Sequence, residues 1–588
     1  MTNLQLTPQE RYALWTSDPY FDPALQAELR ALLAFPKEIA ERFNGWPTFG
    51  TGGMRGQLGA GESRINAVTV ALATRGLART IRSRPAGARP RGVVIAFDTR
   101  LQGAWLAEIA AACLISQDIP VFFSETCRPV PILSFAVRHL QADAGIMITA
   151  SHNPAQYNGY KVYGADGGQI TLDTAGQIMQ AMQSVSDPRT MGRVDPAAAR
   201  RSPLWQVLPE SVDAAYLDYL SKTQIRPENL QSTDLNVVYT PLHGTGALYV
   251  EKILRAAGIS QIRTVQEQAI PDPFFSTVFM PNPESPEAFA KAVSLAESVQ
   301  ADLAVATDPD SDRVGVFARA ASGQYQALSG NQIGLLLMEY ILRSRHDLRQ
   351  LPDDAFCVTT RVSTRLAERV AETYQTELQE TLTGFKYIGE RIQWFDEEAG
   401  QTFCFGFEES FGYLAGTLVR DKDALQALLL ICELAAEAKA KGQSLIDRLD
   451  SLYQHYGYAA EKTVSIEFSG LDGLQEQRSV MTALRQRLTT GEASLIGGQT
   501  ARSWQDYQKP NEPEYHNGAH NPRYLPPADM LYWEMGGELG LDWICIRPSG
   551  TEPKLKIYLG AYAGDPARAA DHLAHLLDGM TELILSCR

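Results

Sequence analysis

One pattern recurs along most of this chain: a short apolar run ends abruptly in small or polar residues, and a helix-like stretch follows. Runs of this kind are Val93–Phe97, Ala144–Ile148, Leu235–Tyr239, Leu303–Ala306, Phe356–Thr360 and Phe403–Phe407. Continuous apolar runs bounded by turn residues are typical of strands buried on both faces. Because parallel strands need long crossover connections, the alternation of strand and helix predicts α/β domains with a parallel sheet.

The pattern changes near residue 459. Val464–Phe468 alternates like a half-exposed strand, and two apolar strands precede a final helix predicted over Pro566–Leu585. This arrangement favours an antiparallel α+β module. At 588 residues, and with about 150 residues per domain, the chain has room for roughly four domains.

The predicted fold class is therefore α/β in four domains: three similar mixed α/β domains plus a C-terminal α+β domain, arranged around a central cleft. The segment from Ser184 to Pro209 is rich in Pro, Arg and Ala, and we interpret it as a linker or domain edge. The predicted bounds are residues 1–205, 206–325, 326–457 and 458–588.

The loop Thr149–Pro154 follows the buried run Ala144–Ile148 directly. Open α/β sheets bind their ligands at the carboxyl ends of such strands. A serine there is exposed, so Ser151 is a candidate carrier of a phosphoryl group. A turn that merely ends the strand explains the hexapeptide equally well. Lys161 follows an Asn-Gly pair that predicts a tight turn, and it could serve as a proton-transfer group close to the serine.

A second polar loop, Thr307–Arg313, places carboxylates at alternate positions: Asp308, Asp310 and Asp312. Such side chains can all turn onto one hard cation. An EF-hand calcium loop would need Gly at its sixth position and Glu at its twelfth, and both positions are arginines here. A solvated acidic turn is the remaining alternative. Arg313 directly after the aspartates favours phosphoryl chemistry, because Arg and a divalent cation together neutralise a transferring phosphoryl group.

Three further loops carry polar groups. Phe49–Gly56 is glycine-dense with one cation, Arg55, although a flexible surface loop would look the same. Gly406–Gly412 and Lys422 offer carboxylate, hydroxyl and amine groups suited to a sugar, or simply a helix N-cap. Arg547–Pro553 combines a guanidinium, two hydroxyls and a glycine, which suits a phosphate cradle.

Composition limits the partners. The net charge of −15 argues against a general nucleic-acid or anionic-membrane surface. The start has no secretory-signal pattern and no run approaches a membrane span, which needs about 20 apolar residues. The seven cysteines are scattered without CxxC pairs, as in a reducing compartment. We expect a cytoplasmic protein, a monomer or dimer.

With these loops in order, the chain resembles the α-D-phosphohexomutase superfamily over nearly its whole length. The resemblance rests on Thr149–Pro154, Asp308–Arg313, Gly406–Gly412 and Arg547–Pro553, one loop in each predicted domain. It is closest to the phosphoglucomutase/phosphomannomutase branch that includes phosphopentomutase-like members. Supporting segments are Phe49–Gly56, Tyr239–Gly246, Pro281–Glu284 and Thr383–Lys386. Two departures stand out: Gly53-Met54 replaces a more usual Ala/Ser-Leu pair, and Lys556 stands where many relatives have Arg.

The resemblance implies roles for particular residues. Ser151 would be the phosphoserine and, with Asp308, Asp310 and Asp312, would hold one Mg²⁺. Lys161, with Arg55 beside it, would do acid/base work, and His152 also matches an active-site position. The residues implied in substrate binding are Arg313, Lys386, Glu408, Ser410, Lys422, Arg547, Ser549, Gly550 and Thr551.

The implied reaction interconverts a sugar 1-phosphate and a sugar 6-phosphate, with α-D-glucose phosphates favoured. It would proceed through the enzyme phosphoserine, with a sugar 1,6-bisphosphate as intermediate and activator. The alternatives are a phosphopentomutase, a phosphomannomutase, a glucose 1,6-bisphosphate synthase and, from another class, a non-catalytic sugar-phosphate sensor. A rate assay on glucose, mannose and ribose 1-phosphates separates them.

Overall fold

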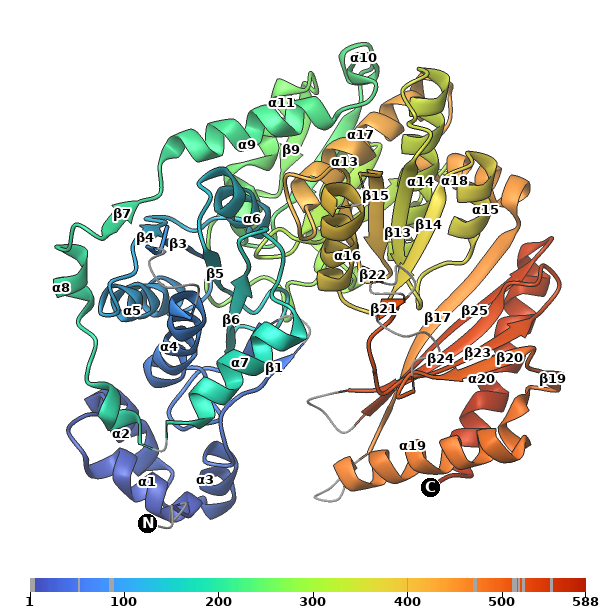
Figure 1. Cartoon of the computed structure of the whole chain (residues 1–588). Helices are drawn as coiled ribbons and strands as arrows, with labels where there is room; N and C mark the ends of the chain where they lie inside the picture. The colour runs from blue at the N-terminus through green and yellow to red at the C-terminus, as the bar shows by residue number, and fades with distance from the viewer. Residues whose placement is uncertain are drawn as a thin grey trace.

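The computed structural model describes residues 6–50, 53–83, 89–185, 187–398, 400–468, 473–509, 515–516, 519–520, 524–549 and 554–588. Figure 1 follows the chain from a blue N-terminal part, through a green and yellow middle, to a red C-terminal part on the opposite side. Each of these parts is built on a β-sheet of its own, and the four sheets follow one another along the chain. In the part of the chain described, no helix is both long and apolar enough to cross a bilayer.

The first sheet has the order β1-β2-β6-β5-β3-β4-β7 among the described residues. Its strands are Phe49–Gly50 (β1), Gly53–Gln57 (β2), Val93–Phe97 (β3), Val121–Phe123 (β4), Ala144–Ile148 (β5), Tyr157–Tyr163 (β6) and Trp205–Val207 (β7). Strands β5, β3, β4 and β7 are parallel, whereas β6, β2 and β1 are antiparallel. The predicted parallel strands with crossover helices are present, and the sheet is mixed because only a short loop returns β5 to β6, whereas parallel pairing needs a crossover.

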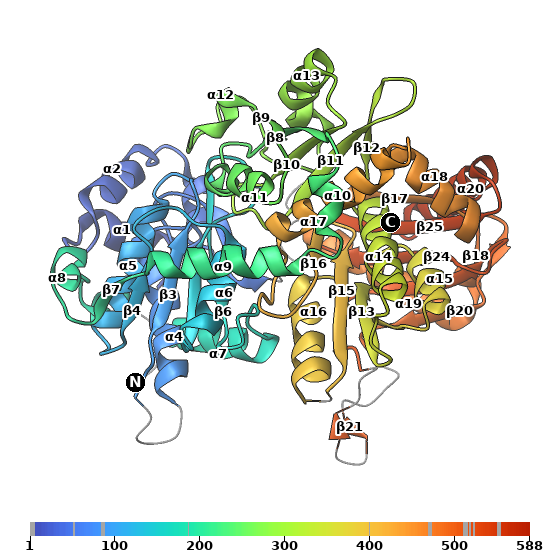
Figure 2. The ribbon, with the colours of Figure 1, turned by 90° about the horizontal axis from the view of Figure 1, so that it is seen from above.

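Helices cover both faces of this sheet, and three more precede its first strand at the N-terminus. They are Pro8–Ser17 (α1), Pro23–Ala31 (α2), Pro36–Arg42 (α3), Ala67–Arg82 (α4), Gly103–Ile115 (α5), Val130–His139 (α6), Leu172–Gln183 (α7), Pro196–Arg200 (α8) and Glu210–Thr223 (α9). The predicted linker 184–209 contains α8 and β7, so it is an edge of the first sheet. Strand β7 also runs across the predicted boundary at residues 205 and 206. Figure 2 shows α9 passing from this part toward the yellow part of the chain.

The predicted Asn-Gly turn before Lys161 was wrong. Asn158 and Gly159 lie inside β6, where Gly159 is opposite Arg55 of β2. A Cβ atom at Gly159 would lie 2.5 Å from the carbonyl oxygen of Thr149 and 2.7 Å from that of Met54. The glycine is needed because two neighbouring backbones approach it closely, and not because the chain reverses there.

The second sheet has the order β12-β11-β10-β8-β9, with β10, β8 and β9 parallel. Its strands are Asn236–Thr240 (β8), Gln261–Thr264 (β9), Leu303–Thr307 (β10), Val314–Arg319 (β11) and Tyr325–Leu328 (β12). Its helices are Pro227–Gln231 (α10), Thr245–Leu248 (η2), Val250–Ala256 (α11), Gln266–Ala269 (α12), Pro286–Phe289 (η3) and Ala290–Val299 (α13). Strand β12 extends past the predicted boundary at residue 325.

The third sheet has the order β14-β13-β15-β16. Its strands are Ala355–Thr360 (β13), Glu377–Thr381 (β14), Thr402–Glu408 (β15) and Gly412–Leu414 (β16). Its helices are Gly330–Asp347 (α14), Leu366–Thr373 (α15), Phe385–Ile392 (α16), the π-helix Gln393–Glu398 (η4), Ala424–Ala440 (α17) and Leu445–Tyr456 (α18). Side chains cap the two long helices. Ser329 is the N-cap of α14 and Asp423 is the N-cap of α17, and each side chain accepts a hydrogen bond from a backbone N–H of the first turn.

The fourth sheet is antiparallel, in the order β17-β25-β24-β23-β20. Its strands are Tyr458–Glu467 (β17), Ser503–Asp506 (β20), Leu531–Gly536 (β23), Asp542–Pro548 (β24) and Lys554–Ala563 (β25). The helices are Gly473–Thr490 (α19), Glu492–Ser494 (η5) and Pro566–Leu585 (α20), and the short hairpins are Leu495–Ile496 (β18) with Gln499–Thr500 (β19), and Tyr515–His516 (β21) with Ala519–His520 (β22). The predicted antiparallel module and its final helix are confirmed. Much of the long loop predicted over Tyr507–Pro527 lies outside the described residues.

The apolar cores explain which parts are joined. One core cluster runs continuously from α6 and α9 through the second and third sheets to aromatic residues of the fourth, such as Trp543 and Tyr562. The other face of the fourth sheet has a separate core with α19 and α20. The first and third parts are thus packed together, with α9 between them (Figure 2).

Candidate functional site

Ser151 lies at the carboxyl end of β5, but the expectation that it would be exposed was wrong, because only 1% of its surface is exposed. The aspartate loop after β10 covers it. The Ser151 backbone is in the left-handed region, with φ +52°. A non-glycine residue in this region is strained and persists only when its surroundings hold it. The buried Arg100 does so: its guanidinium donates to the carbonyl oxygens of Ser151, Asn153, Pro154 and Tyr157.

The end of the neighbouring strand β3 supports the same loop. The Thr149 hydroxyl donates to Asp98 Oδ2 at 2.5 Å and accepts a hydrogen bond from the Ser151 backbone N–H at 2.9 Å. Asp98 also pairs with Arg100 Nε at 3.3 Å. Strands β3 and β5 are parallel neighbours, so their carboxyl ends bring these side chains together at one edge of the sheet.

The aspartate loop after β10 meets Ser151 directly. The Ser151 hydroxyl donates to Asp308 Oδ2 at 2.6 Å. Oxygen atoms of Asp308, Asp310 and Asp312 lie within 4.8 Å of one another, and all three residues are buried. Asp310 Oδ1 and Asp312 Oδ1 are buried without a hydrogen-bond partner. Buried carboxylate oxygens left unpaired are costly unless a cation approaches them, so this trio suits a hard divalent ion.

Two lysines from different parts of the chain approach the trio. Lys161 Nζ donates to Asp310 Oδ2 at 2.8 Å and to Asp312 Oδ2 at 3.1 Å. Lys422 Nζ lies 3.2 Å from Asp312 Oδ2. Both amines are almost fully buried, and their positive charges offset those of Asp310 and Asp312.

These contacts determine which groups stay charged. Burial and the charges of Asp310 and Asp312 raise the pKa of Asp308 well above its usual range. Burial acts against the charged form of Asp312 too, but Lys161, Lys422 and Arg313 lower its pKa strongly. Burial opposes the charge of Lys161, yet the two aspartates it touches raise its pKa. Lys161 is therefore held as an ammonium group.

Three further basic side chains lie near the serine and aspartate loops. Arg313 pairs with Glu284 and lies 3.9 Å from Asp312 Oδ1. Arg55 Nη1 donates to Asn153 Oδ1 at 3.4 Å. His152 Nδ1 is 3.3 Å from the Ser151 hydroxyl, and burial together with the guanidinium groups of Arg313 and Arg55 lowers the pKa of His152 well below its usual range. This histidine is therefore neutral.

The predicted sugar loop lies at the end of β15 beside these cations. Glu408 is buried; burial raises its pKa, while Lys422, Arg313 and a hydrogen bond from Ser410 oppose the rise. Burial and Glu408 raise the pKa of its neighbour Glu409 to about 7, although Arg547 opposes this. The sugar loop thus stands between the aspartate loop and the predicted phosphate cradle.

The predicted cradle is at the end of β24. Arg547 is paired in register with Lys556 of β25, and burial and the Arg547 charge lower the pKa of that lysine. Arg547 and Ser549 line a cavity of about 360 Å³ together with Tyr387 of α16. Gly550 and Thr551, also predicted here, lie outside the described residues.

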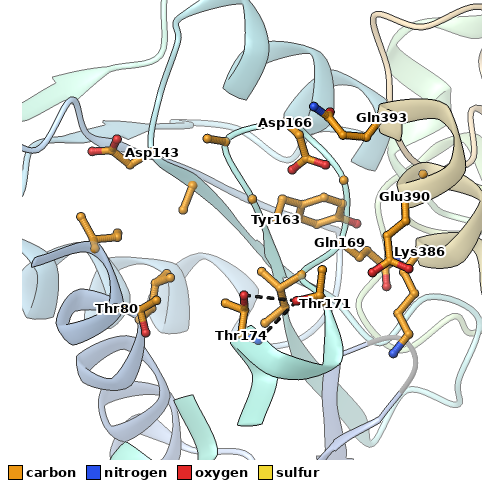
Figure 3. A pocket seen from close by; sticks show the side chains of 18 of the residues that line it. Thr80, Asp143, Tyr163, Asp166, Gln169, Thr171, Thr174, Lys386, Glu390 and Gln393 are labelled. Atoms are coloured by element: carbon orange, nitrogen blue, oxygen red, sulfur yellow. Dashed lines mark hydrogen bonds between the residues drawn. The ribbon is translucent and has the colours of Figure 1, made fainter. Parts of the chain in front are cut away.

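Lys386 stands apart from the aspartates. It lies on α16, where burial lowers its pKa and Glu390 opposes the change. Its side chain lines a second cavity of about 380 Å³ between α16 and the first sheet (Figure 3). Among the described residues, no hydrogen bond or ion pair joins Lys386 to the aspartate loop.

Sequence reasoning missed several residues that hold the site. Asp98 and Arg100 follow a buried strand, as the predicted site residues do, and this position was the available signal. Asp421, which accepts from Lys422 Nζ at 2.9 Å, had no such signal. Its other partners, Tyr163 and Gln169, come from the first domain, more than 250 positions earlier.

Comparisons with known proteins agree with this arrangement. Three family models match: phosphoglucomutase/phosphomannomutase alpha/beta/alpha domain I over residues 47–189, domain II over 214–323 and domain III over 329–456. Among relatives, a phosphoglucomutase of Staphylococcus epidermidis is 38% identical over 525 residues, covering 89% of this chain and 92% of the relative. A phosphoglucomutase of Staphylococcus aureus is 36% identical, covering 89% and 91%.

Solved structures share the fold at lower identity. The open form of the pp63/parafusin phosphoglucomutase of Paramecium gives a TM-score of 0.66 at 18% identity, covering 92% of this chain and 95% of that one. A phosphoglucomutase/phosphomannomutase family protein of Burkholderia thailandensis gives 0.63 at 17% identity, covering 92% and 97%. The chain belongs to the phosphoglucomutase/phosphomannomutase family, within the α-D-phosphohexomutase superfamily that its four loops resemble.

Proposed function

We propose that this protein is a phosphoglucomutase-type intramolecular phosphotransferase that interconverts α-D-glucose 1-phosphate and glucose 6-phosphate. The observation that carries the proposal is the hydrogen bond from the Ser151 hydroxyl to Asp308 inside a buried trio of aspartates with unpaired oxygens. The curated relatives named phosphoglucomutase support glucose as the sugar.

Ser151, Asp308, Asp310 and Asp312 would hold one Mg²⁺, and the fit rests on the two buried carboxylate oxygens that have no hydrogen-bond partner. When bound, the ion would supply positive charge that neutralises the transferring phosphoryl group. Arg313 and Lys422 would add fixed charge at the same place. Such preorganised charge is usually the largest contribution to phosphoryl transfer.

The chain's own part in the chemistry starts from a phosphorylated Ser151. A sugar hydroxyl attacks phosphorus, the bond between phosphorus and Ser151 Oγ breaks, and the hydroxyl proton passes to a base. Lys161 was predicted as that base, but its ion pairs raise its pKa and hold it as an ammonium group, which cannot accept a further proton. Its role as the base stays a prediction, with Arg55 and the neutral His152 beside it.

The other end of the sugar phosphate would be bound by Arg547 and Ser549, with Gly550 and Thr551 as further predicted contacts. Glu408 and Ser410 would accept and donate hydrogen bonds to sugar hydroxyls between the two ends, and Lys386 is proposed to contact the substrate from α16. The sugar 1,6-bisphosphate formed in the first transfer would turn end for end, so that the second transfer restores phosphoserine.

The test is an initial-rate assay of the purified protein with Mg²⁺ and a trace of glucose 1,6-bisphosphate. Glucose 1-phosphate should be converted faster than mannose 1-phosphate or ribose 1-phosphate. A faster rate on either competitor would identify a phosphomannomutase or phosphopentomutase, and net accumulation of bisphosphate would reveal a synthase. Binding without turnover of any of them would leave a sensor.

Three further predictions accompany the proposal. We expect a cytoplasmic location, and all seven cysteines are free thiols, which suits a reducing compartment. We expect a monomer or dimer, which light scattering would establish. We expect no nucleic-acid or membrane partner, in line with the net charge of −15.

A further inference from the structure

The loop between β16 and α17 contains a buried carboxylate whose partners come from two domains. Asp421 is 1% exposed. Its Oδ2 accepts from the Tyr163 hydroxyl at 2.9 Å and from Gln169 Nε2 at 2.7 Å. Its Oδ1 accepts from the Lys422 backbone N–H at 2.8 Å and from Lys422 Nζ at 2.9 Å. One oxygen thus faces the first domain and the other holds the lysine.

Lys422 has little freedom to reach any other place. A Cβ atom on Gly412 would lie 2.2 Å from Lys422 Cδ, so the lysine stem lies directly against the glycine backbone. The ammonium group also lies 5.4 Å from the centre of the Phe385 ring. From there Nζ reaches Asp312 at 3.2 Å. A stem confined in this way delivers its charge to one point only.

Strand β6 connects this arrangement to the other lysine. Lys161 and Tyr163 are two residues apart on β6, and side chains two apart in a strand point to the same face. Lys161 contacts Asp310 and Asp312, while Tyr163 contacts Asp421. Burial and the Asp421 charge raise the pKa of Tyr163 well above its usual value, so its hydroxyl stays protonated and remains a donor. Tyr163 and Gln169 line the cavity between the first domain and α16 (Figure 3).

We propose that Asp421 is a positioning residue that aims the Lys422 ammonium group at the aspartate loop, and that Tyr163 and Gln169 of the first domain hold Asp421 in place. The inference rests on the proposed function for its effect on catalysis, but not for the position of the lysine. The first domain would thus help to position the Lys422 ammonium group, which belongs to the third domain.

The test uses a double-mutant cycle. Tyr163→Phe removes one donor to Asp421 and keeps the ring, so kcat/KM for glucose 1-phosphate should fall about tenfold, the value of one charged hydrogen bond. Lys422→Met should lower kcat/KM for glucose 1-phosphate further. In the Lys422→Met background, Tyr163→Phe should then cost less than twofold, because the residue through which it acts is gone.

A matched control is a tyrosine that donates to another aspartate of the same loop. Tyr216 of α9 is also buried, and its hydroxyl donates to Asp423 at 2.9 Å, but the Asp423 carboxylate caps α17 by accepting from the Gln426 backbone N–H. Tyr216→Phe should change kcat/KM less than twofold, even if its unfolding temperature falls as much as that of Tyr163→Phe. Equal losses of kcat/KM in the two variants would overturn the proposal, and so would a tenfold effect of Tyr163→Phe that persists without Lys422.

A second readout needs no turnover. Lys422 is 5% exposed, so a small amine-acylating reagent should label it slowly in the wild-type protein, as quantified by peptide mass spectrometry. Labelling of Lys422 should rise several-fold in Tyr163→Phe and in Asp421→Asn, and stay unchanged in Tyr216→Phe. Unchanged labelling in the first two variants would overturn the positioning role. Because labelling is independent of the reaction, it tests the proposal even if no sugar phosphate proves to be a substrate.

Discussion

Replacing Arg100 by lysine should loosen the serine loop without removing any group that reacts. The arginine makes four hydrogen bonds to backbone carbonyls from two nitrogen atoms. A lysine amine is a single atom that cannot span the same acceptors, so we expect at least two charged hydrogen bonds to be lost. At about 1.5 kcal/mol each, local opening of the loop becomes easier by about 3 kcal/mol.

Amide hydrogen exchange measures this opening directly. The backbone N–H groups of Thr149, Ser151, Asn153 and Tyr157 all donate hydrogen bonds within or beside the loop. A loss of about 3 kcal/mol should speed their exchange on the order of 100-fold, because each 1.4 kcal/mol is a factor of about ten. Activity should fall as well, since the strained backbone of Ser151 is no longer held in place.

The control is Arg193→Lys. Arg193 is exposed and also donates to backbone carbonyls, those of Pro19, Tyr20 and Phe21, but it lies away from the serine loop. This variant should leave the exchange of residues 149–157 unchanged. If the exchange of that peptide in Arg100→Lys stays within threefold of the wild-type rate, the guanidinium does not hold the loop and the reasoning is refuted.

Four other outcomes are expected. Ser151→Ala should lose mutase turnover and leave the intact mass free of phosphate, whereas wild-type-like activity would exclude Ser151 as the carrier. A chelator should stop the reaction and excess Mg²⁺ should restore it; full activity in the chelator would remove the ion from the proposal. Arg547→Ala should raise KM about 10- to 100-fold by losing a charged contact to phosphate, and an unchanged KM would place the cradle elsewhere. Burial raises the pKa of Asp423 to about 6, above the value of about 4 in an unfolded chain. The stability that Asp423 contributes is therefore fully present below pH 4 and is lost as the pH rises through 6. Asp423→Asn should remove that part of the pH dependence of the denaturant midpoint, and identical pH profiles of the variant and the wild type would contradict the shift.

Much of the fold followed from local pattern. Strands such as Val93–Phe97 and Ala144–Ile148 appear with the predicted bounds, because both faces of each strand are buried and its apolar run is continuous. Where the chain turns was harder to predict from the sequence. Asn158-Gly159 looked like a turn, yet the pair lies within β6, where the glycine serves close packing of backbones. Local propensity cannot distinguish these two uses of glycine.

The site divides in the same way. Ser151 and the three aspartates could be named because each follows a buried strand, and the fold brings those strand ends together. Asp421 and Tyr163 could not be named, because their importance lies in a contact between residues 258 positions apart. The same limit applied to Lys161, whose ion pairs with the second domain favour its protonated form and leave its predicted use as a base open.

The left-handed backbone of Ser151 restricts which amino acid can carry phosphate at this point. Threonine has a hydroxyl of similar reactivity, but a β-branched residue is strongly disfavoured at a positive φ. A threonine would have to leave that conformation and draw its oxygen away from Asp308. The choice of serine as the phosphate acceptor is thus imposed by the path of the main chain, before any question of nucleophilicity arises. Ser151→Thr is accordingly expected to be a poor substitute in an assay of mutase turnover.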